Sequence, residues 1–139
     1  SGRNGPILAI RPGGEGDVTD THLLWKNITG GPHVPSAVYY QKRLYVINDT
    51  GTLSCINALS GQLIWKVRLK GRFSMSPVLS GNKIIITNEK GLTSIFKAGN
   101  SFELIAENDL KEETLASPAV LGGQIFIRTA THLYCIEKD

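Results

Sequence analysis

The chain has 139 residues, of which 41% are hydrophobic and 19% charged, and its formal net charge at pH 7 is +3. These values suit one globular domain with a buried core and exclude an intrinsically disordered chain. No apolar run approaches the ~20 residues of a transmembrane helix, and the small positive charge gives little reason to expect nucleic acid as a partner.

The first residues, Ser-Gly-Arg-Asn-Gly, contain neither an initiator methionine nor a signal-peptide pattern, so we expect a fragment of a longer protein. Two short apolar stretches follow, at residues 7–10 and 23–26, and each has the length of a β-strand. The polar segment between them, residues 11–20, is expected to be a loop. Because helical periodicity is found nowhere in the chain, an all-β fold is predicted.

A repeat of ~40 residues occupies the rest of the chain. Each copy opens with a serine and continues with two apolar strands, a polar turn and a third strand. The three openings are Ser36-Ala37-Val38, Ser76-Pro77-Val78 and Ser117-Pro118-Ala119. We therefore divide the chain into residues 1–34, 35–75, 76–116 and 117–139.

Each complete copy holds four predicted strands, A to D. Between strands A and B, Gly81-Asn82 and Gly122-Gly123 are strong hairpin signals, and Gln41-Lys42 is a weaker one. Strand D is predicted at residues 63–69 and again at residues 102–107. The strands along the chain are therefore C-D, A-B-C-D, A-B-C-D and A-B-C.

Four-stranded antiparallel units that recur at ~40–45 residues are typical of the blades of a β-propeller, so we predict a propeller segment of about three blades. An eight-stranded sandwich is the alternative, but it does not require the same turn residues to recur. Propellers close a ring of about four to eight blades. We therefore expect partners that are other blades or other copies of the chain, and a dimer or larger assembly at micromolar concentration.

The stretch C-I-N-A-L-S-G-Q-L-I-W, which ends at Trp65, carries the most specific motif. Gly61 can supply the positive φ of a tight turn, and the short polar side chains of Asn57 and Ser60 can hydrogen-bond the turn backbone. Trp65 follows on the next strand, and we expect its ring to be largely buried against a neighbouring unit. This stretch resembles the tryptophan-docking repeat A-x-D-x-x-T-G-x-x-x-W of pyrroloquinoline-quinone (PQQ)-type propellers, with Cys55, Asn57 and Ser60 in place of Ala, Asp and Thr.

The resemblance covers nearly the whole chain and is to bacterial PQQ-like repeat proteins of the BamB-related type, in which such units form the closing blades. It implies a protein that is periplasmic or otherwise exported. Trp25 stands in the first unit where Trp65 stands in the second, but the unit that starts at Ser76 has no tryptophan, and Phe102 is its nearest aromatic residue. Docking between the last two units is therefore expected to differ. The residues assigned to the docking motif are Cys55, Asn57, Ser60, Gly61, Trp65 and Trp25.

By resemblance, a catalytic member of the PQQ family would carry a vicinal cysteine pair against the quinone, and Glu, Asn and Asp around calcium. Cys55 and Cys135 instead lie in different units, where we expect both to be unpaired core residues. The acidic residues are scattered over separate turns, and the histidines lack zinc-site spacing: Asp17, Asp20, Asp49 and Glu89; His22, His33 and His132. We expect no catalytic, cofactor-binding or metal-binding residue in this segment.

Cationic residues alternate with apolar ones in and after the strand that carries Trp65. They are Lys66, Arg68, Lys70 and Arg72. Alternation in a strand places all four on one face. Such a stripe suits phosphate or an acidic polypeptide, although the outermost strand of a blade also carries Lys and Arg to resist edge-to-edge aggregation.

The most consistent function is a non-catalytic module for protein interaction or scaffolding in an exported bacterial protein. One alternative is a fragment of a PQQ-dependent alcohol or sugar dehydrogenase, whose active site, with PQQ and calcium, lies in other blades. A second alternative is a propeller that binds carbohydrate or polyanions.

Overall fold

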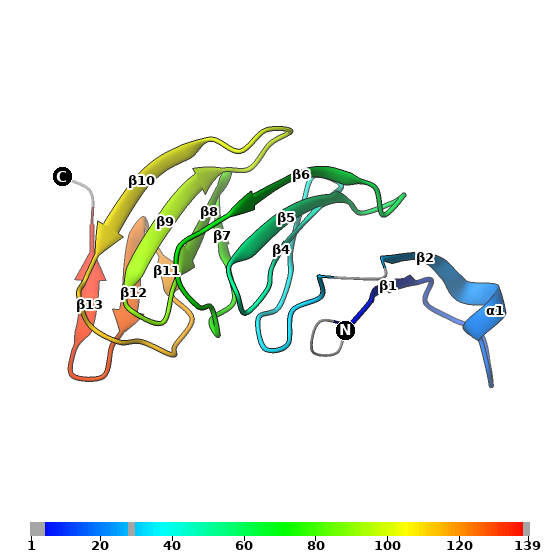
Figure 1. Ribbon diagram of the computed structural model, residues 1–139, viewed down its shortest axis with the longest axis horizontal. Helices are drawn as coiled ribbons and strands as arrows, with labels where there is room; N and C mark the ends of the chain where they lie inside the picture. Colours follow the sequence, from blue (N-terminus) through cyan, green and yellow to red (C-terminus); the bar gives the residue numbers. More distant parts are fainter. Residues whose placement is uncertain (1–4, 28–29, 138–139) are drawn as a thin grey trace.

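The structure is a computed structural model that describes residues 5–27 and 30–137. Parts of the outer units predicted at residues 1–34 and 117–139, namely residues 1–4, 28–29 and 138–139, lie outside the described residues. The described chain forms four antiparallel sheets that follow one another along the molecule (Figure 1). Among the described residues, no helix is long and apolar enough to cross a membrane.

The strands of each sheet are consecutive in the chain. The N-terminal hairpin consists of β1 (Ile7–Ile10) and β2 (Leu23–Asn27). The first blade consists of β3 (Val38–Tyr40), β4 (Arg43–Ile47), β5 (Thr52–Asn57) and β6 (Leu63–Arg68). The second blade consists of β7 (Val78–Ser80), β8 (Lys83–Thr87), β9 (Leu92–Lys97) and β10 (Leu104–Asp109). The third blade consists of β11 (Ala119–Leu121), β12 (Gln124–Arg128) and β13 (Leu133–Ile136).

Strands within each blade pair in chain order, as up-and-down meanders. The prediction of an all-β propeller segment is thereby confirmed. Its hairpins use the expected glycines, but the first one turns on Gln41 and Lys42, whose φ values are 46° and 62°. These two residues adopt the left-handed conformation that a two-residue hairpin with the right-handed strand twist requires.

Two details of the predicted strands are wrong. A short helix, α1 (Thr19–His22), lies in the segment expected to be a loop, where His22 N–H donates to Val18 O. Strand β10 begins at Leu104 and not at Phe102, because Lys97 N–H donates to Glu103 O and closes a turn that contains Phe102. Both differences result from local hydrogen bonds, which the pattern of hydrophobic residues in the sequence does not reveal.

A hydrogen bond between equivalent serines links each blade to the next. Ser36 N–H donates to Ser76 Oγ, and Ser76 N–H donates to Ser117 Oγ, each at 2.9 Å. The serines that open each sequence repeat therefore form a ladder from blade to blade. The same contact therefore recurs at both boundaries between blades.

The main hydrophobic core lies between the first and second blades. Its fully buried members come from both sheets and from the segment that joins them: Tyr45, Ile47, Leu53, Cys55, Phe73, Ile84, Ile86 and Phe96. We call this contact the first interface, and the contact between the second and third blades the second interface.

Candidate functional site

Trp25 of the N-terminal hairpin docks on the turn that follows β5. Its indole Nε1 donates to Ala58 O at 2.9 Å, and the neighbouring Asn27 Nδ2 donates to Gly61 O at 3.0 Å. A Cβ atom added to Gly61 would lie 2.7 Å from the Trp25 ring, and the φ of Gly61 is +73°. Glycine is therefore required at this position both for the backbone conformation and for the space that the ring occupies.

The turn beneath Trp25 is shaped by its own polar side chains. Asn57 Oδ1 accepts hydrogen bonds from the backbone N–H groups of Leu59 and Ser60 at 3.0 and 3.1 Å. Ser60 Oγ accepts one from Gln62 N–H at 3.3 Å. These bonds hold the turn in the conformation that presents Ala58 O and Gly61 to the next indole.

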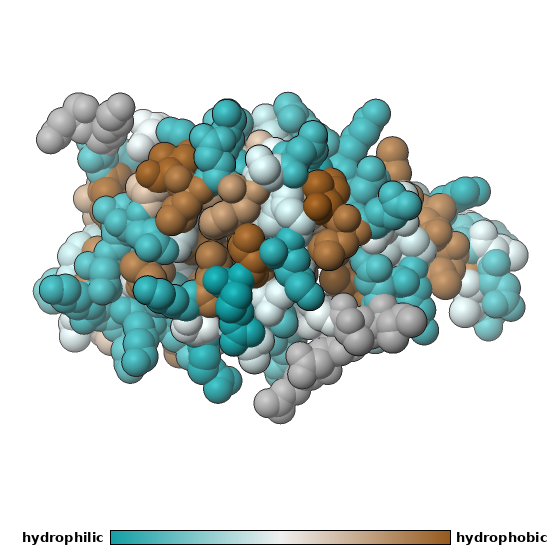
Figure 2. Space-filling model, turned by 45° about the horizontal axis from the view of Figure 1, so that its top comes forward, coloured by the Kyte–Doolittle hydropathy of each residue, from teal (hydrophilic) through white to brown (hydrophobic). Residues whose placement is uncertain are grey.

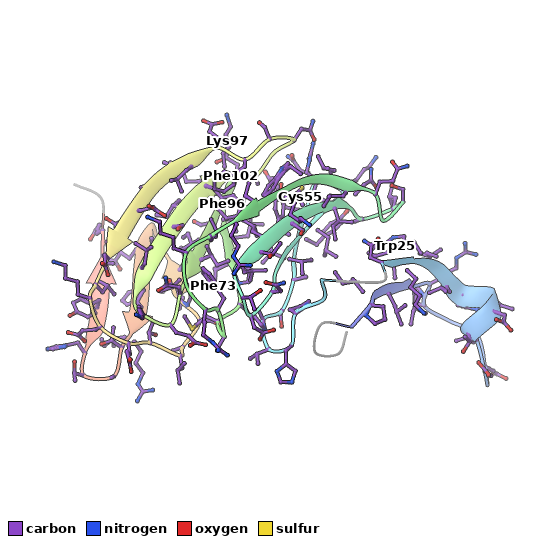
Figure 3. The ribbon with its side chains drawn as sticks, in the orientation of Figure 1. Trp25, Cys55, Phe73, Phe96, Lys97 and Phe102 are labelled. Carbon is purple, nitrogen blue, oxygen red and sulfur yellow. The ribbon has the colours of Figure 1, made fainter. Side chains whose placement is uncertain are left out.

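Trp65 makes the corresponding contact with the second blade. Its Nε1 donates to Gly99 O at 3.1 Å, and its ring lies edge-on to Phe96 and Phe102, at centroid distances of 6.1 and 5.7 Å. Figure 3 labels both phenylalanines beside Cys55, at the contact between the two four-stranded sheets. The indole is partly and not largely buried, because β6 is the edge strand of its sheet.

The two cysteines differ in their surroundings. Cys55 is buried in the first interface, where its Sγ lies 3.9 Å from Gly99 O, and burial raises the pKa of its thiol. Burial also raises the pKa of the adjacent Tyr45 phenol to about 12. Cys135 is free but exposed, so the prediction of two core cysteines is wrong for this residue. Cys135 lies on the edge strand β13, between two residues, Tyr134 and Ile136, that are partly buried.

The four predicted cations are all exposed, but they do not form one continuous strand face. Strand β6 ends at Arg68, so Lys70 and Arg72 lie in the segment beyond it. Arg68 Nη1 lies 3.4 Å from the Thr52 hydroxyl, and Arg72 lies 3.8 Å from the Glu89 carboxylate. Only Lys66 and Arg68 therefore share the strand face predicted for the stripe.

Glu112, in the loop between β10 and β11, is a polar centre that the sequence analysis missed. Its carboxylate accepts hydrogen bonds from the hydroxyls of Thr129 (2.6 Å), Thr131 (2.7 Å) and Tyr134 (2.8 Å). The bond from Thr129 and then that from Thr131 lower the pKa of Glu112 to about 2, and the bond to Glu112 raises the pKa of Tyr134. The polar turn that begins at Thr129 was the only sequence signal, and it does not indicate which acid it binds.

The family model described as "Outer membrane protein assembly factor BamB" matches residues 14–101. The chain belongs to this BamB family. No curated protein matches it. The predicted resemblance to PQQ-like propeller proteins of the BamB-related type is confirmed.

The solved structures that share the fold include the following three. BamB from Moraxella catarrhalis superposes with a TM-score of 0.74 and 17% identity, over 97% of this chain and 41% of that chain. A europium-containing methanol dehydrogenase superposes with a TM-score of 0.59 and 12% identity, over 75% of this chain and 21% of that chain. A quinohemoprotein alcohol dehydrogenase from Pseudomonas putida superposes with a TM-score of 0.58 and 16% identity, over 80% of this chain and 24% of that chain. The chain thus spans less than half the length of each of these proteins.

The described residues do not bring together the side chains that a PQQ and calcium site would use. Cys55 and Cys135 lie in the first and third blades, so they cannot form a vicinal pair. In the described part of the chain, no three His, Cys, Asp or Glu residues converge in a group that could hold a metal ion.

Proposed function

We propose that the chain is a non-catalytic segment of an exported propeller of the BamB family and that it acts by binding protein. The observation that carries this proposal is the outer face of the N-terminal hairpin. Leu8, Ile10 and Leu23 are 46%, 59% and 43% exposed there, and all three side chains line one groove. Figure 2 shows apolar residues reaching the surface at the end of the molecule that this hairpin forms.

The shape of this face suits a further β-sheet. A groove of about 220 Å³ runs over the hairpin and α1, lined by Leu8, Ile10, Val18, Thr19, Leu23 and Lys26. In the described part of the chain, β1 pairs with β2 alone, so its other edge is open. An open strand edge beside an apolar face binds an extended segment through backbone hydrogen bonds and side-chain packing. For the 139-residue chain, the partner is therefore a blade-like sheet of another copy of the chain.

The family supports the same function. Its model is described by a role in outer membrane protein assembly, and the Moraxella relative carries the same name. A protein with this role would work in the periplasm and bind polypeptides. We propose the same compartment and the same general class of partner for this chain.

Light scattering of the 139-residue chain tests the proposal. We expect a mass above 15.1 kDa at micromolar concentration. The double substitution Leu8→Lys/Leu23→Lys should return the mass to that of a monomer, because it places charges on the apolar face. The control is Leu59→Lys, at a residue that is 68% exposed in the turn after β5. A wild-type monomer over the whole concentration range would contradict the proposal.

The likeness to a methanol dehydrogenase and to a quinohemoprotein alcohol dehydrogenase makes a dehydrogenase fragment the second candidate. Dye reduction with an alcohol by the full-length protein, after addition of PQQ and calcium, distinguishes the two, because the active site of the second candidate would lie in other blades. We expect no reduction. Alcohol-dependent reduction by the full-length protein would favour the enzyme.

A further inference from the structure

Ala106 occupies in the second blade the position that Trp65 occupies in the first. Trp65 pairs with Cys55, which pairs with Tyr45 across the first blade. Ala106 pairs with Ile95, which pairs with Ile85 across the second blade. The two rows of three residues therefore lie at equivalent places on equivalent faces, one with two large aromatic rings and the other with none.

A cavity of about 330 Å³ lies where the second row meets the third blade. Its apolar walls come from both sheets: Ile85, Ile95, Ala106, Ile125, Ile127 and Ile136. Asn108 and Thr93 add polar groups, and the exposed Lys83 and Glu137 also line the cavity, which therefore opens to solvent. In the first interface, the equivalent space is filled by Tyr45, Trp65 and Phe96, whose ring centroids lie 5.9–6.2 Å apart.

We propose that this cavity is a binding site for a small, uncharged, planar aromatic molecule of about the size of indole. The fold itself places an indole group at the equivalent position in the first interface, so the space between two such blades matches this shape. The volume lies at the small end of the range of about 300–1,000 Å³ that is typical of ligand sites. Apolar cavities left by missing large side chains bind aromatic molecules of this kind.

The polar groups of the site fit the same ligand. The Asn108 carboxamide, on the strand that carries Ala106, offers an acceptor for a ring N–H, as Gly99 O does for the indole of Trp65. The isoleucine walls disfavour a charged ligand, because they would remove its hydration without replacing it. This site is separate from the outer face of the N-terminal hairpin and does not depend on the function proposed for that face.

Titration of the 139-residue chain with indole, followed by its backbone amide NMR signals, tests the site. We expect saturable shifts at Ala106, Ile125 and Ile136. Ala106→Trp should weaken binding by at least about tenfold, because the new side chain occupies the ligand volume. The matched control is Leu104→Trp, an indole added on the same strand at a residue that is 46% exposed and does not line the cavity. It should leave the affinity unchanged.

Three results would overturn the proposal: no saturable shifts, equal affinity for wild type and Ala106→Trp, or shifts at these amides that depend on protein concentration alone. The last result would mean that a second copy of the chain fills the cavity. If Ala106→Trp does not fold, Ala106→Leu takes its place, because leucine also fills the space but strains the contact less.

Discussion

The first and second interfaces bury equivalent positions with different side chains. The first is filled by Tyr45, Trp65 and Phe96, and is the main hydrophobic core of the molecule. At the second, smaller residues stand at the same places, and a cavity remains. Repetition of the backbone therefore does not require repetition of the packing.

Backbone hydrogen bonds explain why the blades stay equivalent. Phe73 N–H donates to Asp49 O, and Thr114 N–H donates to Glu89 O, at the same place between successive blades. The second interface adds polar bonds of its own, including those of Glu112 and that of the Thr114 hydroxyl to Arg128 O at 2.6 Å. Hydrogen bonds fix geometry but contribute modestly to net stability, whereas aromatic burial contributes more. We therefore expect the first interface to hold most of the stability.

Removal of the Trp65 side chain from the first interface should have the largest effect on stability. Trp65→Ala is expected to lower the free energy of unfolding by about 3–5 kcal/mol, because it empties the first interface and removes the bond to Gly99 O. Urea denaturation measures the loss. Lys66→Ala, at the exposed neighbour on the same strand, should change stability by less than about 0.5 kcal/mol. Equal stability of Trp65→Ala and wild type would contradict the docking role.

The glycine beneath Trp25 provides the second test. Gly61→Ala should cost about 1–3 kcal/mol, because the added methyl group collides with the indole and the φ of +73° strains the new residue. Gly81 has a φ of +57° and open space around it, so Gly81→Ala carries the backbone strain alone. The difference between the two variants in thermal or urea unfolding measures the indole contact. No difference would mean that Trp25 moves away without cost.

Filling the second interface should make it more like the first. Ala106→Leu is expected to raise the free energy of unfolding by about 0.5–2 kcal/mol, the usual gain from filling a cavity. Leu133→Ala, at a residue that is 72% exposed on β13 and does not line the cavity, serves as the reference for a change outside it. Loss of stability in Ala106→Leu would show that the second interface cannot accept the packing of the first.

Loss of the polar contacts of Glu112 at the second interface should have the smallest effect on stability, and this effect should depend on acidic pH. Hydrogen bonds from threonine hydroxyls lower the pKa of Glu112 from its ordinary 4.5 to about 2. The stability that ionised Glu112 contributes to the folded chain is therefore present above pH 4.5 and is lost as the pH falls towards about 2. We expect Glu112→Gln to flatten the fall in urea midpoint over this range, with Glu113→Gln as control. An unchanged pH profile in Glu112→Gln would show that other carboxylates account for the fall.

The sequence by itself determined the strands and their repetition. Recurring serines and hairpin turns, such as Gly81-Asn82, are local signals, because each acts within a few residues of itself. The polar turn from Asn57 to Gly61 could be predicted for the same reason. The missing tryptophan in the second blade was also visible and predicted a different contact between the last two units, but it did not predict the cavity beside Ala106.

Only the tertiary structure decided what these elements contact. Cys55 and Cys135 occupy equivalent strand positions, yet one is buried and the other exposed, because only Cys55 has a blade packed over it among the described residues. Glu112 finds its threonine partners across a blade boundary, and the cavity beside Ala106 depends on side chains from two sheets. Burial and long-range hydrogen bonding depend on which surfaces meet, and a repeat along the chain does not specify what packs on each copy.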